Sequence, residues 1–470
     1  MKSGLDFVGS VKETVKNLEG SYALATIYNG EPTKILCARQ QSPLVIGVSD
    51  AFSCVASDIP AILNITNRVI DVNNGEMVEI SDQGIRFWAL TDWTPIDKKT
   101  RLISWTVDMA EKQGYPHFMI KEINEQPMSL SNALRLQENY LNLLATFLDR
   151  SEEIFLLACG TSYNACLASS YMFSSLANLP TYPIIASEFI ERYGESVNIG
   201  STILAVSQSG ETADVLQAVE HARFKAATIL GLTNILGSTL TRVSRAYIVQ
   251  QSKPEIGVAA TKTFTAQLIV MAQLALRLAK IRGKVSQDKI DFLEAKLSET
   301  PKIIEHIIET QSEKILNIAK KYKDAECFYF LGRGISTATA YEARLKLLEI
   351  AYIPSIAYPA GESKHGPISL VQSGFPVVFI CPSDNTRKIL LGNIMEMKAR
   401  GARIIAVIDS NDNEIMNLAD DYITIPPGIP GVLSPISYVI PLQLLAYYMA
   451  VERGLNPDMP RNLAKSVTVL

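Results

Sequence analysis

The sequence is poor in cysteine and histidine, and neither residue type is arranged for metal binding. Six cysteines are scattered over 470 residues without a CxxC pair or a neighbouring histidine. This pattern excludes a recognisable zinc site and a dense disulfide framework, and we expect neither a metal nor another cofactor. The thiols are typical of a reduced protein, so the sequence predicts a cytoplasmic location.

Clusters of one charge sign are also lacking. Forty-four basic and 48 acidic residues give a formal charge of −4, and no Lys/Arg block stands out. Nothing therefore supports a nucleic-acid footprint or a polybasic membrane patch. With 47% hydrophobic and 20% charged residues, the chain also differs from long disordered and fibrous sequences.

No apolar run is long enough to be interpreted as a membrane span. The most apolar stretch, Pro435 to Val451, is interrupted by Pro441 and Gln443 and falls short of the ~20 residues that span a bilayer. The first residues, MKSGLDFVGSVKE, acquire charge too early for a signal peptide. At roughly 150 residues per domain the chain holds about three domains, and we expect a soluble enzyme.

Three composition regimes divide the chain. Residues 1–95 alternate short apolar runs with turn signals, such as YALATIY before Asn29-Gly30 and KILCA after it, which predict antiparallel β structure. Residues 96–150 are polar and helix-prone, and we expect a helical linker there. From residue 151 onward, buried strands alternate with amphipathic helices, which is typical of a parallel sheet wound by helices on both faces.

The α/β region contains an internal duplication. Strand IFLLACG ends at Gly160, and its counterpart CFYFLGRG has the matching glycine at Gly332, an offset of 172. Three further strand pairs, beginning with TILAVSQSGET and PVVFICPSDNT, repeat at offsets of 174, 175 and 175. We therefore expect two tandem, doubly wound parallel-sheet domains at 151–290 and 320–457, followed by a tail at 458–470.

A hydroxyl-rich turn follows one strand of the first copy. The sequence SQSGET (207–212) lies between a strand and a helix, where backbone N–H groups and the helix dipole favour an anion. It lacks the lysine of a nucleotide P-loop, and a plain N-cap would need only one Ser or Thr. The spacing predicts a phosphate cradle. The neighbouring turn CGTS (159–162) either faces the same ligand or is an ordinary loop.

The second copy has replaced this turn by CPSDNT (381–386), which has lost the SxSGxT spacing. We expect the second copy to bind no phosphate there. In this interpretation the first copy holds a phosphorylated ligand and the second copy contributes the reactive groups.

Candidate reactive groups concentrate in the second copy. Glu342, Lys346 and Glu349 are spaced i, i+4 and i+7 and share one helix face. One interpretation is a surface ion pair that contributes well under ~1 kcal/mol to stability. The other is a carboxylate that acts as a general base beside a lysine partner. The helical periodicity does not distinguish these two interpretations. His365 lies between two glycines in GESKHG, where an imidazole could move protons on a sugar oxygen. The other three histidines sit in helical patterns and are expected to be structural or solvated.

The C-terminal tail contains PRNLAKSV at 460–467. A tail normally frays, but one that holds Arg and Lys between small residues could fold over a pocket as a lid. Lys465 could then form an imine with a carbonyl substrate, provided that its surroundings favoured the neutral amine.

Six segments carry a resemblance to a known family: LACGTSYNA, SQSGETADVL, EIGVAATKTFTAQ, GRGISTATAYEARLKLLEIAYI, AGESKHGPISL and PRNLAKSVTV. From about residue 10 to residue 470 the chain closely resembles the glutamine–fructose-6-phosphate amidotransferases, the glucosamine-6-phosphate synthases. ESKHGP and NLAKSVTV are the most specific pieces, whereas many sugar isomerase (SIS) proteins share the SxSGxT loop. The resemblance implies two SIS domains and an enzyme that turns fructose 6-phosphate and an amino donor into glucosamine 6-phosphate.

The resemblance also implies roles for individual positions. Lys465 would form a Schiff base with C2 of the open-chain ketose, and Glu349, supported by Lys346, would move a proton between C1 and C2. His365 would assist ring opening across a homodimer interface. The family often has Ser where this chain has Ala260, so one sugar contact would be missing or would come from the backbone. The implied phosphosugar contacts are Cys159, Gly160, Thr161, Ser162, Ser207, Gln208, Ser209, Thr212, Val258, Ala260 and Ala464.

The N-terminal region departs from the family pattern. Residues 10–95 resemble only the second half of the family's glutaminase domain, and the first cysteine is Cys37, inside a predicted strand. A mechanism that uses an N-terminal nucleophile needs that nucleophile, so we expect this polypeptide alone not to hydrolyse glutamine. A truncated chain, a separate glutaminase chain, or free ammonia as the nitrogen donor would each explain the pattern.

Two rival function classes stay open. One is a deaminase or deglycase that cleaves the C–N bond of an amino-sugar phosphate on the same scaffold, and the NLAKSVTV tail disfavours it. The other is a non-catalytic sugar-phosphate sensor, which the combination of Glu349, His365 and Lys465 disfavours.

Overall fold

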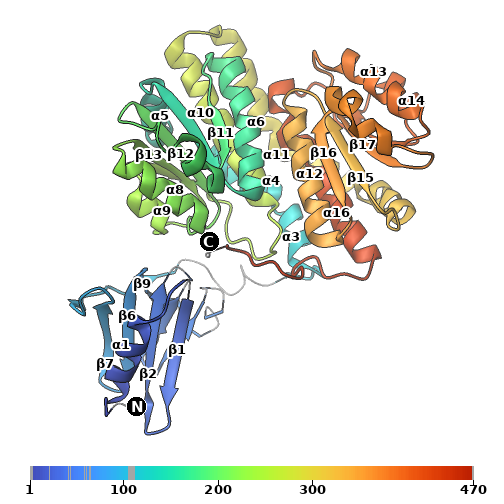
Figure 1. Cartoon of the computed structure of the whole chain (residues 1–470). Helices are drawn as coiled ribbons and strands as arrows, with labels where there is room; N and C mark the ends of the chain where they lie inside the picture. Colours follow the sequence, from blue (N-terminus) through green and yellow to red (C-terminus); the bar gives the residue numbers. More distant parts are fainter. Residues whose placement is uncertain are drawn as a thin grey trace. The chain divides into compact units, whose positions relative to one another are not determined.

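The computed structural model describes residues 4–20, 22–40, 42, 44–57, 59, 61–62, 65–103 and 112–467. The chain divides into two compact units, one formed by residues 1–113 with 467–470 and the other by residues 114–466. Each unit has its own sheets, and Figure 1 shows the first in blue and the second in cyan to red.

Two antiparallel sheets build the first unit. Strands β1 and β2 form the hairpin predicted around Asn29-Gly30, with Ala25 opposite Cys37, and helix α1 packs Phe7 and Val11 against the same sheet. The strand orders are β1-β2-β6-β7-β8 and β4-β3-β5-β9. The elements of this unit are α1 (Phe7–Lys16), β1 (Tyr22–Tyr28), β2 (Glu31–Gln40), β3 (Val45–Val48), β4 (Ser53–Ala56), β5 (Arg68–Asp71), β6 (Glu76–Ser81), β7 (Gly84–Ala89), β8 (Pro95–Ile96) and β9 (Arg101–Leu102).

The second unit contains two five-stranded parallel sheets with the same strand order, β11-β10-β12-β13-β14 and β16-β15-β17-β18-β19. The predicted duplication and the doubly wound fold class are therefore confirmed. The sequence missed the fifth pair, the short edge strands at 182 and 355, which repeat at an offset of 355 − 182 = 173. The strands are β10 (Glu153–Ala158), β11 (Tyr182–Ile185), β12 (Ser201–Ser207), β13 (Thr228–Thr233), β14 (Ala246–Val249), β15 (Phe328–Gly332), β16 (Ser355–Pro359), β17 (Pro376–Cys381), β18 (Arg403–Asp409) and β19 (Asp421–Ile425).

Helices cover both faces of each parallel sheet, which is why the strands are apolar at successive positions. In β10, Leu156 belongs to a core shared by both copies, whereas its neighbours Phe155 and Leu157 belong to a separate core on the other face. The helices of this unit are α3 (Phe118–Asn124), α4 (Gln126–Leu134), α5 (Glu138–Asp149), α6 (Gly160–Ala177), α7 (Phe189–Tyr193), α8 (Ala213–Phe224), α9 (Thr239–Val243), α10 (Lys262–Arg282), α11 (Gln287–Tyr322), α12 (Ser336–Ala351), α13 (Arg387–Lys398), α14 (Asn413–Leu418), α15 (Ser434–Tyr438) and α16 (Ile440–Glu452).

The segment expected to be a helical linker contributes to the core of the second unit. Met119 and Ile123 of α3 and Leu144 of α5 are fully buried in the core that both copies share. Long helix α11 connects the copies and packs against both α4 and α16. The two SIS-like copies therefore form one packed body rather than two domains joined by a flexible connection.

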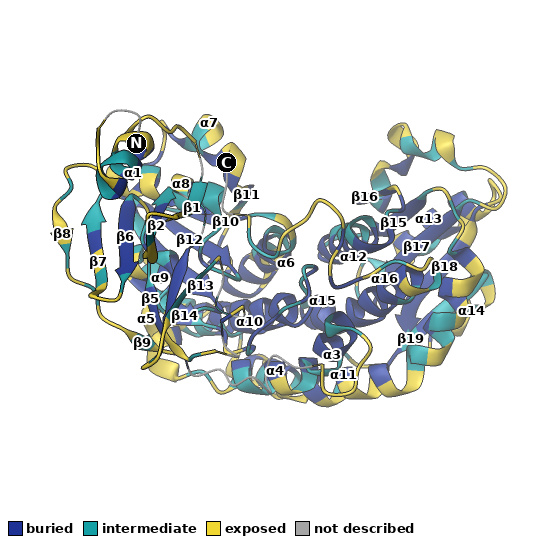
Figure 2. Cartoon of the chain, turned by 90° about the horizontal axis from the view of Figure 1, so that it is seen from below, coloured by how far each residue is buried: buried dark blue, intermediate teal, exposed yellow. Residues whose placement is uncertain are grey.

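Two apolar helical segments of this unit are long enough to cross a membrane by length and hydropathy. They are α10 and residues 431–452, and 78% and 89% of their most apolar windows are buried. The second includes the stretch that the sequence interpretation set aside as too short. Figure 2 shows α10, α15 and α16 as mostly buried, whereas α11 exposes residues along one side. Burial inside the protein explains their hydropathy.

Candidate active site

The hydroxyl groups of the SQSGET turn form hydrogen bonds within the turn. It begins at Ser207, the last residue of β12, and ends at Thr212, which precedes α8. The Ser207 and Thr212 hydroxyls lie 2.9 Å apart, and Ser207 Oγ accepts the Gly210 N–H at 3.0 Å. The Glu211 N–H donates to Ser209 Oγ at 3.1 Å. Three hydroxyl groups therefore gather at the N-terminal end of a 12-residue helix, as an anion site requires.

The acidic member of the turn bonds to helix α9. The Glu211 carboxylate accepts the Thr239 N–H at 2.8 Å, at the start of α9. Gly210 has φ +68°, and a Cβ built there would lie 2.2 Å from Ser238 Oγ and 2.6 Å from Ser238 Cβ. Rotating the serine hydroxyl would not make room, because the serine Cβ is itself in the way.

Replacing Gly210 by alanine is expected to lower the free energy of unfolding by about 2–4 kcal/mol, because it adds overpacking to left-handed strain. Gly237→Ala is the matched control, since Gly237 has φ +81° and nothing within 4 Å of a built Cβ, and it should cost only about 1–2 kcal/mol. Urea unfolding of both variants measures the difference. Equal losses would mean that close packing is not what requires glycine at 210.

The corresponding turn of the second copy satisfies its donors internally. Asp384 Oδ1 accepts the Thr386 N–H at 2.8 Å and the Thr386 hydroxyl at 2.7 Å. A carboxylate thus lies near the start of α13, where a phosphate would otherwise bind, and like charges repel. The geometry supports the expectation that this turn binds no phosphate, which stays a prediction.

The turn at 159–162 contacts the charged helix of the other copy. Thr161 Oγ1 donates to Glu342 Oε1 at 3.1 Å and accepts from Lys346 Nζ at 3.0 Å. Asn164, one turn along α6, donates to Glu342 Oε2 at 2.8 Å. The sequence left open whether this turn was an ordinary loop, and the structure shows that it joins the two copies.

The three charged residues of α12 lie on one face, as the spacing predicted. Lys346 Nζ is 2.6 Å from Glu349 Oε2 and 3.4 Å from Glu342 Oε1. The side chains of Glu342 and Lys346 are fully buried, whereas 22% of the Glu349 side chain is exposed. The group is therefore not a surface ion pair, and Glu349 is its most accessible member.

Burial changes the ionisation of Glu342 in this charged group. It raises the pKa of Glu342 to about 7, although Lys346 and Asn164 act in the opposite direction. Burial alone would lower the pKa of Lys346, but Glu342 and Glu349 outweigh it and raise that pKa. The lysine therefore stays charged, and the buried Glu342 is protonated part of the time near neutral pH.

The C-terminal tail crosses the loop that precedes α10. Lys465 Nζ donates to Glu255 Oε2 at 2.6 Å and to the Gly257 carbonyl at 2.8 Å. Arg461 N–H donates to the hydroxyl of Tyr352, the residue that follows α12 as its C-cap, at 2.7 Å. Glu255 also helps to raise the pKa of Lys346. The tail amine and the charged face of α12 therefore belong to one electrostatic neighbourhood.

Comparisons with known proteins agree with this geometry. The SIS domain family profile matches residues 147–277 and 321–453, the two copies described above. The glutamine–fructose-6-phosphate aminotransferase (isomerizing) of Thermococcus kodakarensis is 41% identical over 471 residues, which is all of this chain and 77% of the relative. The chain belongs to the glutamine–fructose-6-phosphate aminotransferase family.

Two further relatives support the assignment to this aminotransferase family. The enzyme of the same name from Methanothermobacter thermautotrophicus is 42% identical over 469 residues, covering all of this chain and 77% of the relative. The solved C-terminal domain of glucosamine-fructose-6-phosphate aminotransferase from Francisella tularensis is 34% identical, with a TM-score of 0.70. It covers 74% of this chain and 100% of that structure.

The other positions implied by the family resemblance differ in how far they are buried. Ser162 is buried and accepts from Gln267 of α10 at 3.0 Å, so its hydroxyl is already engaged. Cys159 is half-buried, and desolvation raises the pKa of its thiol to about 11, which makes it a poor nucleophile. Val258 and Ala260 are half-buried in the loop under the tail, and Ala464 is exposed beside Lys465.

Three of the histidines differ in their surroundings. His117 lies 3.1 Å from the Tyr447 hydroxyl and His221 lies 3.1 Å from the Gly194 carbonyl, so both have structural partners. His365 is exposed at the end of a 3₁₀ helix (Ala360–His365) that packs beside α13 and β16. It is not among the side chains that contact Thr161 or Lys465.

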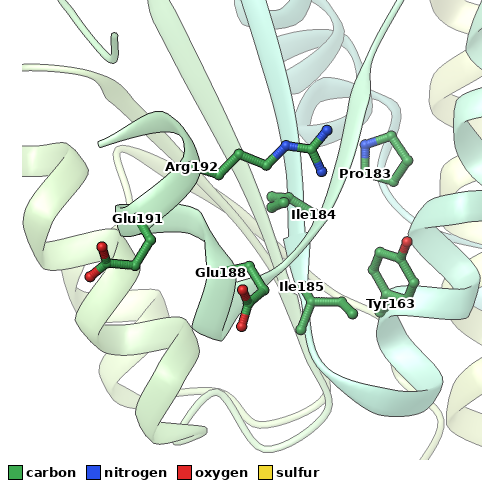
Figure 3. A pocket seen from close by; sticks show the side chains of 7 residues that line it. All are labelled: Tyr163, Pro183, Ile184, Ile185, Glu188, Glu191 and Arg192. Carbon is green, nitrogen blue, oxygen red and sulfur yellow. The ribbon is translucent and has the colours of Figure 1, made fainter. Parts of the chain in front are cut away.

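A cavity of about 320 Å³ beside edge strand β11 is unrelated to these residues. Its polar lining consists of Tyr163, Glu188, Glu191 and Arg192, and Figure 3 shows the Arg192 guanidinium pointing toward Pro183 and away from both carboxylates. Two carboxylates against one guanidinium disfavour a sugar phosphate.

Sequence reasoning left out two residues that the structure places at the centre. Glu342 was recognised as part of the helix face but was not chosen as a site residue, although its spacing from Lys346 carried the signal. Glu255 belongs to no motif that the sequence interpretation used. An acidic residue in the otherwise apolar and small-residue segment EIGVAAT was the available clue, because a buried carboxylate needs a charged or hydrogen-bonding partner.

Proposed function

We propose that this chain converts fructose 6-phosphate and an amino donor into glucosamine 6-phosphate, through a Schiff base and a ketose–aldose isomerisation. The observation that supports it most is the position of Thr161. This residue of the first copy bonds both Glu342 and Lys346 of the second, so the predicted phosphate side and the predicted reactive side meet. The names of the relatives point to the same substrate.

In this proposal the first copy anchors the substrate. Ser207, Ser209 and Thr212 bind the phosphate through their hydroxyl groups, and Gln208 adds an amide donor. The sugar extends from there toward the turn at Cys159–Ser162 and the loop that contains Val258 and Ala260, with Ala464 on the tail side. A fixed anionic end orients the carbon atoms that react.

The second copy and the tail then carry the chemistry. The amine of Lys465 attacks C2 of the open-chain ketose, and the resulting imine withdraws electrons and makes the C1 protons more acidic. Glu349 moves the proton between C1 and C2. Lys346 Nζ donates to Glu349 Oε2 at 2.6 Å and so orients that carboxyl group.

His365 acts in this proposal from a second copy of the chain. Its exposure on a 3₁₀ helix suits a residue that reaches into a neighbouring site of a homodimer, where it assists ring opening. The nitrogen donor is ammonia or glutamine, with a separate glutaminase chain or further glutaminase sequence in the second case. We place the enzyme in the cytoplasm, in keeping with six free cysteines.

Product analysis tests the proposal. Fructose 6-phosphate is incubated with the protein and either ammonia, glutamine, or glutamine plus cell extract, and glucosamine 6-phosphate should appear at least with ammonia. A deaminase would instead favour release of ammonia from glucosamine 6-phosphate. Tight binding of fructose 6-phosphate without turnover under every condition would support a sensor and contradict the proposal.

A further inference from the structure

The carboxylate of Glu255 is fixed in a position from which one oxygen faces the tail lysine. Its Oε1 accepts the N–H groups of Thr261 at 2.9 Å and Thr263 at 3.1 Å. Its Oε2 accepts the Thr263 hydroxyl at 2.7 Å and Lys465 Nζ at 2.6 Å. The side chain is 0% exposed, so no water competes for these four hydrogen bonds.

A second buried acid supports the loop that carries this pair. Glu122 of α3 accepts the N–H groups of Ile256 and Gly257 through Oε1, and its buried Oε2 has no hydrogen-bond partner among the described residues. Burial, and next Glu255, raise the pKa of Glu122 to about 8. Glu122 is therefore neutral at neutral pH, and the negative charge of this acid pair resides on Glu255.

The tail lysine keeps that charge in place. Burial by itself raises the pKa of Glu255, but the Lys465 ammonium and the hydrogen bonds outweigh it and lower the pKa to about 2. The balance depends on the lysine being charged. Once the Lys465 proton is transferred, the compensating charge disappears and burial favours the protonated carboxyl. The pair can therefore exist as an ion pair or as a neutral amine beside a neutral acid.

We propose that Glu255 is the catalytic acid and base for imine formation at Lys465. This inference rests on the proposed function, since it assigns a proton acceptor to the Schiff-base step. A lysine held as an ammonium ion cannot attack a carbonyl carbon, so its proton needs an acceptor within hydrogen-bond distance. Glu255 Oε2 is such an acceptor, and it touches the reacting nitrogen itself.

The protons and charges balance within this pair. Lys465 transfers one proton to Glu255, and its lone pair forms a bond to C2 while the C2–O π electrons move to oxygen. A proton then moves from nitrogen to that oxygen, which gives a neutral carbinolamine. Glu255 returns its proton to the hydroxyl, the C2–O bond breaks, and water leaves as nitrogen donates its lone pair. The products are an iminium ion, water and the Glu255 carboxylate, so the net charge is unchanged.

Borohydride trapping tests this step without any amino donor. Wild type and Glu255→Gln are mixed with fructose 6-phosphate, the imine is reduced at set times, and the adduct on the Lys465 peptide is measured by mass spectrometry. Gln keeps acceptor and donor groups in place but cannot take the proton, so the trapping rate at pH 7 should fall on the order of 10²-fold. The Kd for fructose 6-phosphate should stay the same, because the SQSGET turn is untouched.

The pH profile separates a proton acceptor from a simple counter-ion. Glu122 of α3 interacts electrostatically with both Glu255 and Lys465, and Lys346 of α12 interacts with Glu255, whereas Lys262 at the start of α10 acts on Glu122. All three are kept in Glu255→Gln, so they affect both proteins. The variant should need hydroxide or bulk water as its base, and its trapping rate should rise about tenfold per pH unit from 6 to 8, more steeply than that of wild type.

Three results decide the matter. Trapping by Glu255→Gln at the wild-type rate, with a parallel pH profile, would overturn the role of Glu255. A lower rate with a parallel profile would also overturn it, because a counter-ion alone would then explain the loss. Failure of wild type to form any adduct would instead reject the Schiff base of the proposed function. If Glu255→Gln does not fold, Glu255→Asp, which keeps a carboxylate, should retain the shallower wild-type profile.

Discussion

Lys465→Ala is expected to reduce the rate of glucosamine 6-phosphate formation by at least ~10³-fold, because the nucleophile of the Schiff-base step is removed. The substitution also leaves Glu255 without the ammonium that balances its buried charge, which is destabilising. Lys465→Arg separates the two effects, since a guanidinium can keep the ion pair but does not form an imine. The arginine variant should fold and be as inactive as the alanine variant.

The measurement is product formation from fructose 6-phosphate and ammonia, together with the Kd for fructose 6-phosphate. Both variants should bind the sugar within about threefold of wild type, because the phosphate is held by hydroxyl groups elsewhere. Lys296→Ala is a surface control, since its ion pair with Glu299 is exposed and contributes less than ~1 kcal/mol. Activity of Lys465→Arg near the wild-type level would rule out the Schiff base.

Glu349→Gln is expected to lower turnover by about 10²- to 10⁴-fold, the range for loss of a general base. An amide oxygen can still accept from Lys346 Nζ, which lies 2.6 Å from the carboxylate, so the helix face should remain in place. The imine at Lys465 should still form. The variant should therefore accumulate the adduct that borohydride traps but should not isomerise it.

Deuterium incorporation at C1 in D2O reports the proton transfer directly. Glu342→Gln is the matched control on the same helix. Because burial raises the pKa of Glu342 to about 7, this group is already protonated much of the time near neutral pH, and an amide resembles that state. Its loss of activity should stay below about tenfold. If Glu342→Gln instead stopped deuterium incorporation and Glu349→Gln did not, Glu342 would be the base.

The strand pattern and the helix periodicity were predictable because they depend on local sequence. Runs such as IFLLACG specify strands buried on both faces, and their near-constant offsets specify two copies. The spacing of Glu342, Lys346 and Glu349 determined that they share a face. Edge strands β11 (YPII) and β16 (SIAYP) escaped prediction because each contains a proline and is only partly buried, so neither has the continuous apolar run of the inner strands.

The contacts between the candidate site residues could not be predicted from strand patterns or helix periodicity. Lys346 meets Thr161 across 185 residues of sequence, and Lys465 meets Glu255 across 210. No local pattern encodes such pairs, because they depend on how two sheets and their helices pack around a common core. The same holds for α3 to α5, because their apolar faces are buried in the core that both copies share.

By itself, then, the sequence determined the duplicated α/β fold, the hydroxyl-rich turn of the first copy and the charged face of α12, because turn chemistry and side-chain period act over a few residues. The tertiary structure alone decided which carboxylates are buried, which one keeps a proton and which one faces the tail amine. Burial and the distance between charges control those properties, and both are fixed only when distant segments pack together.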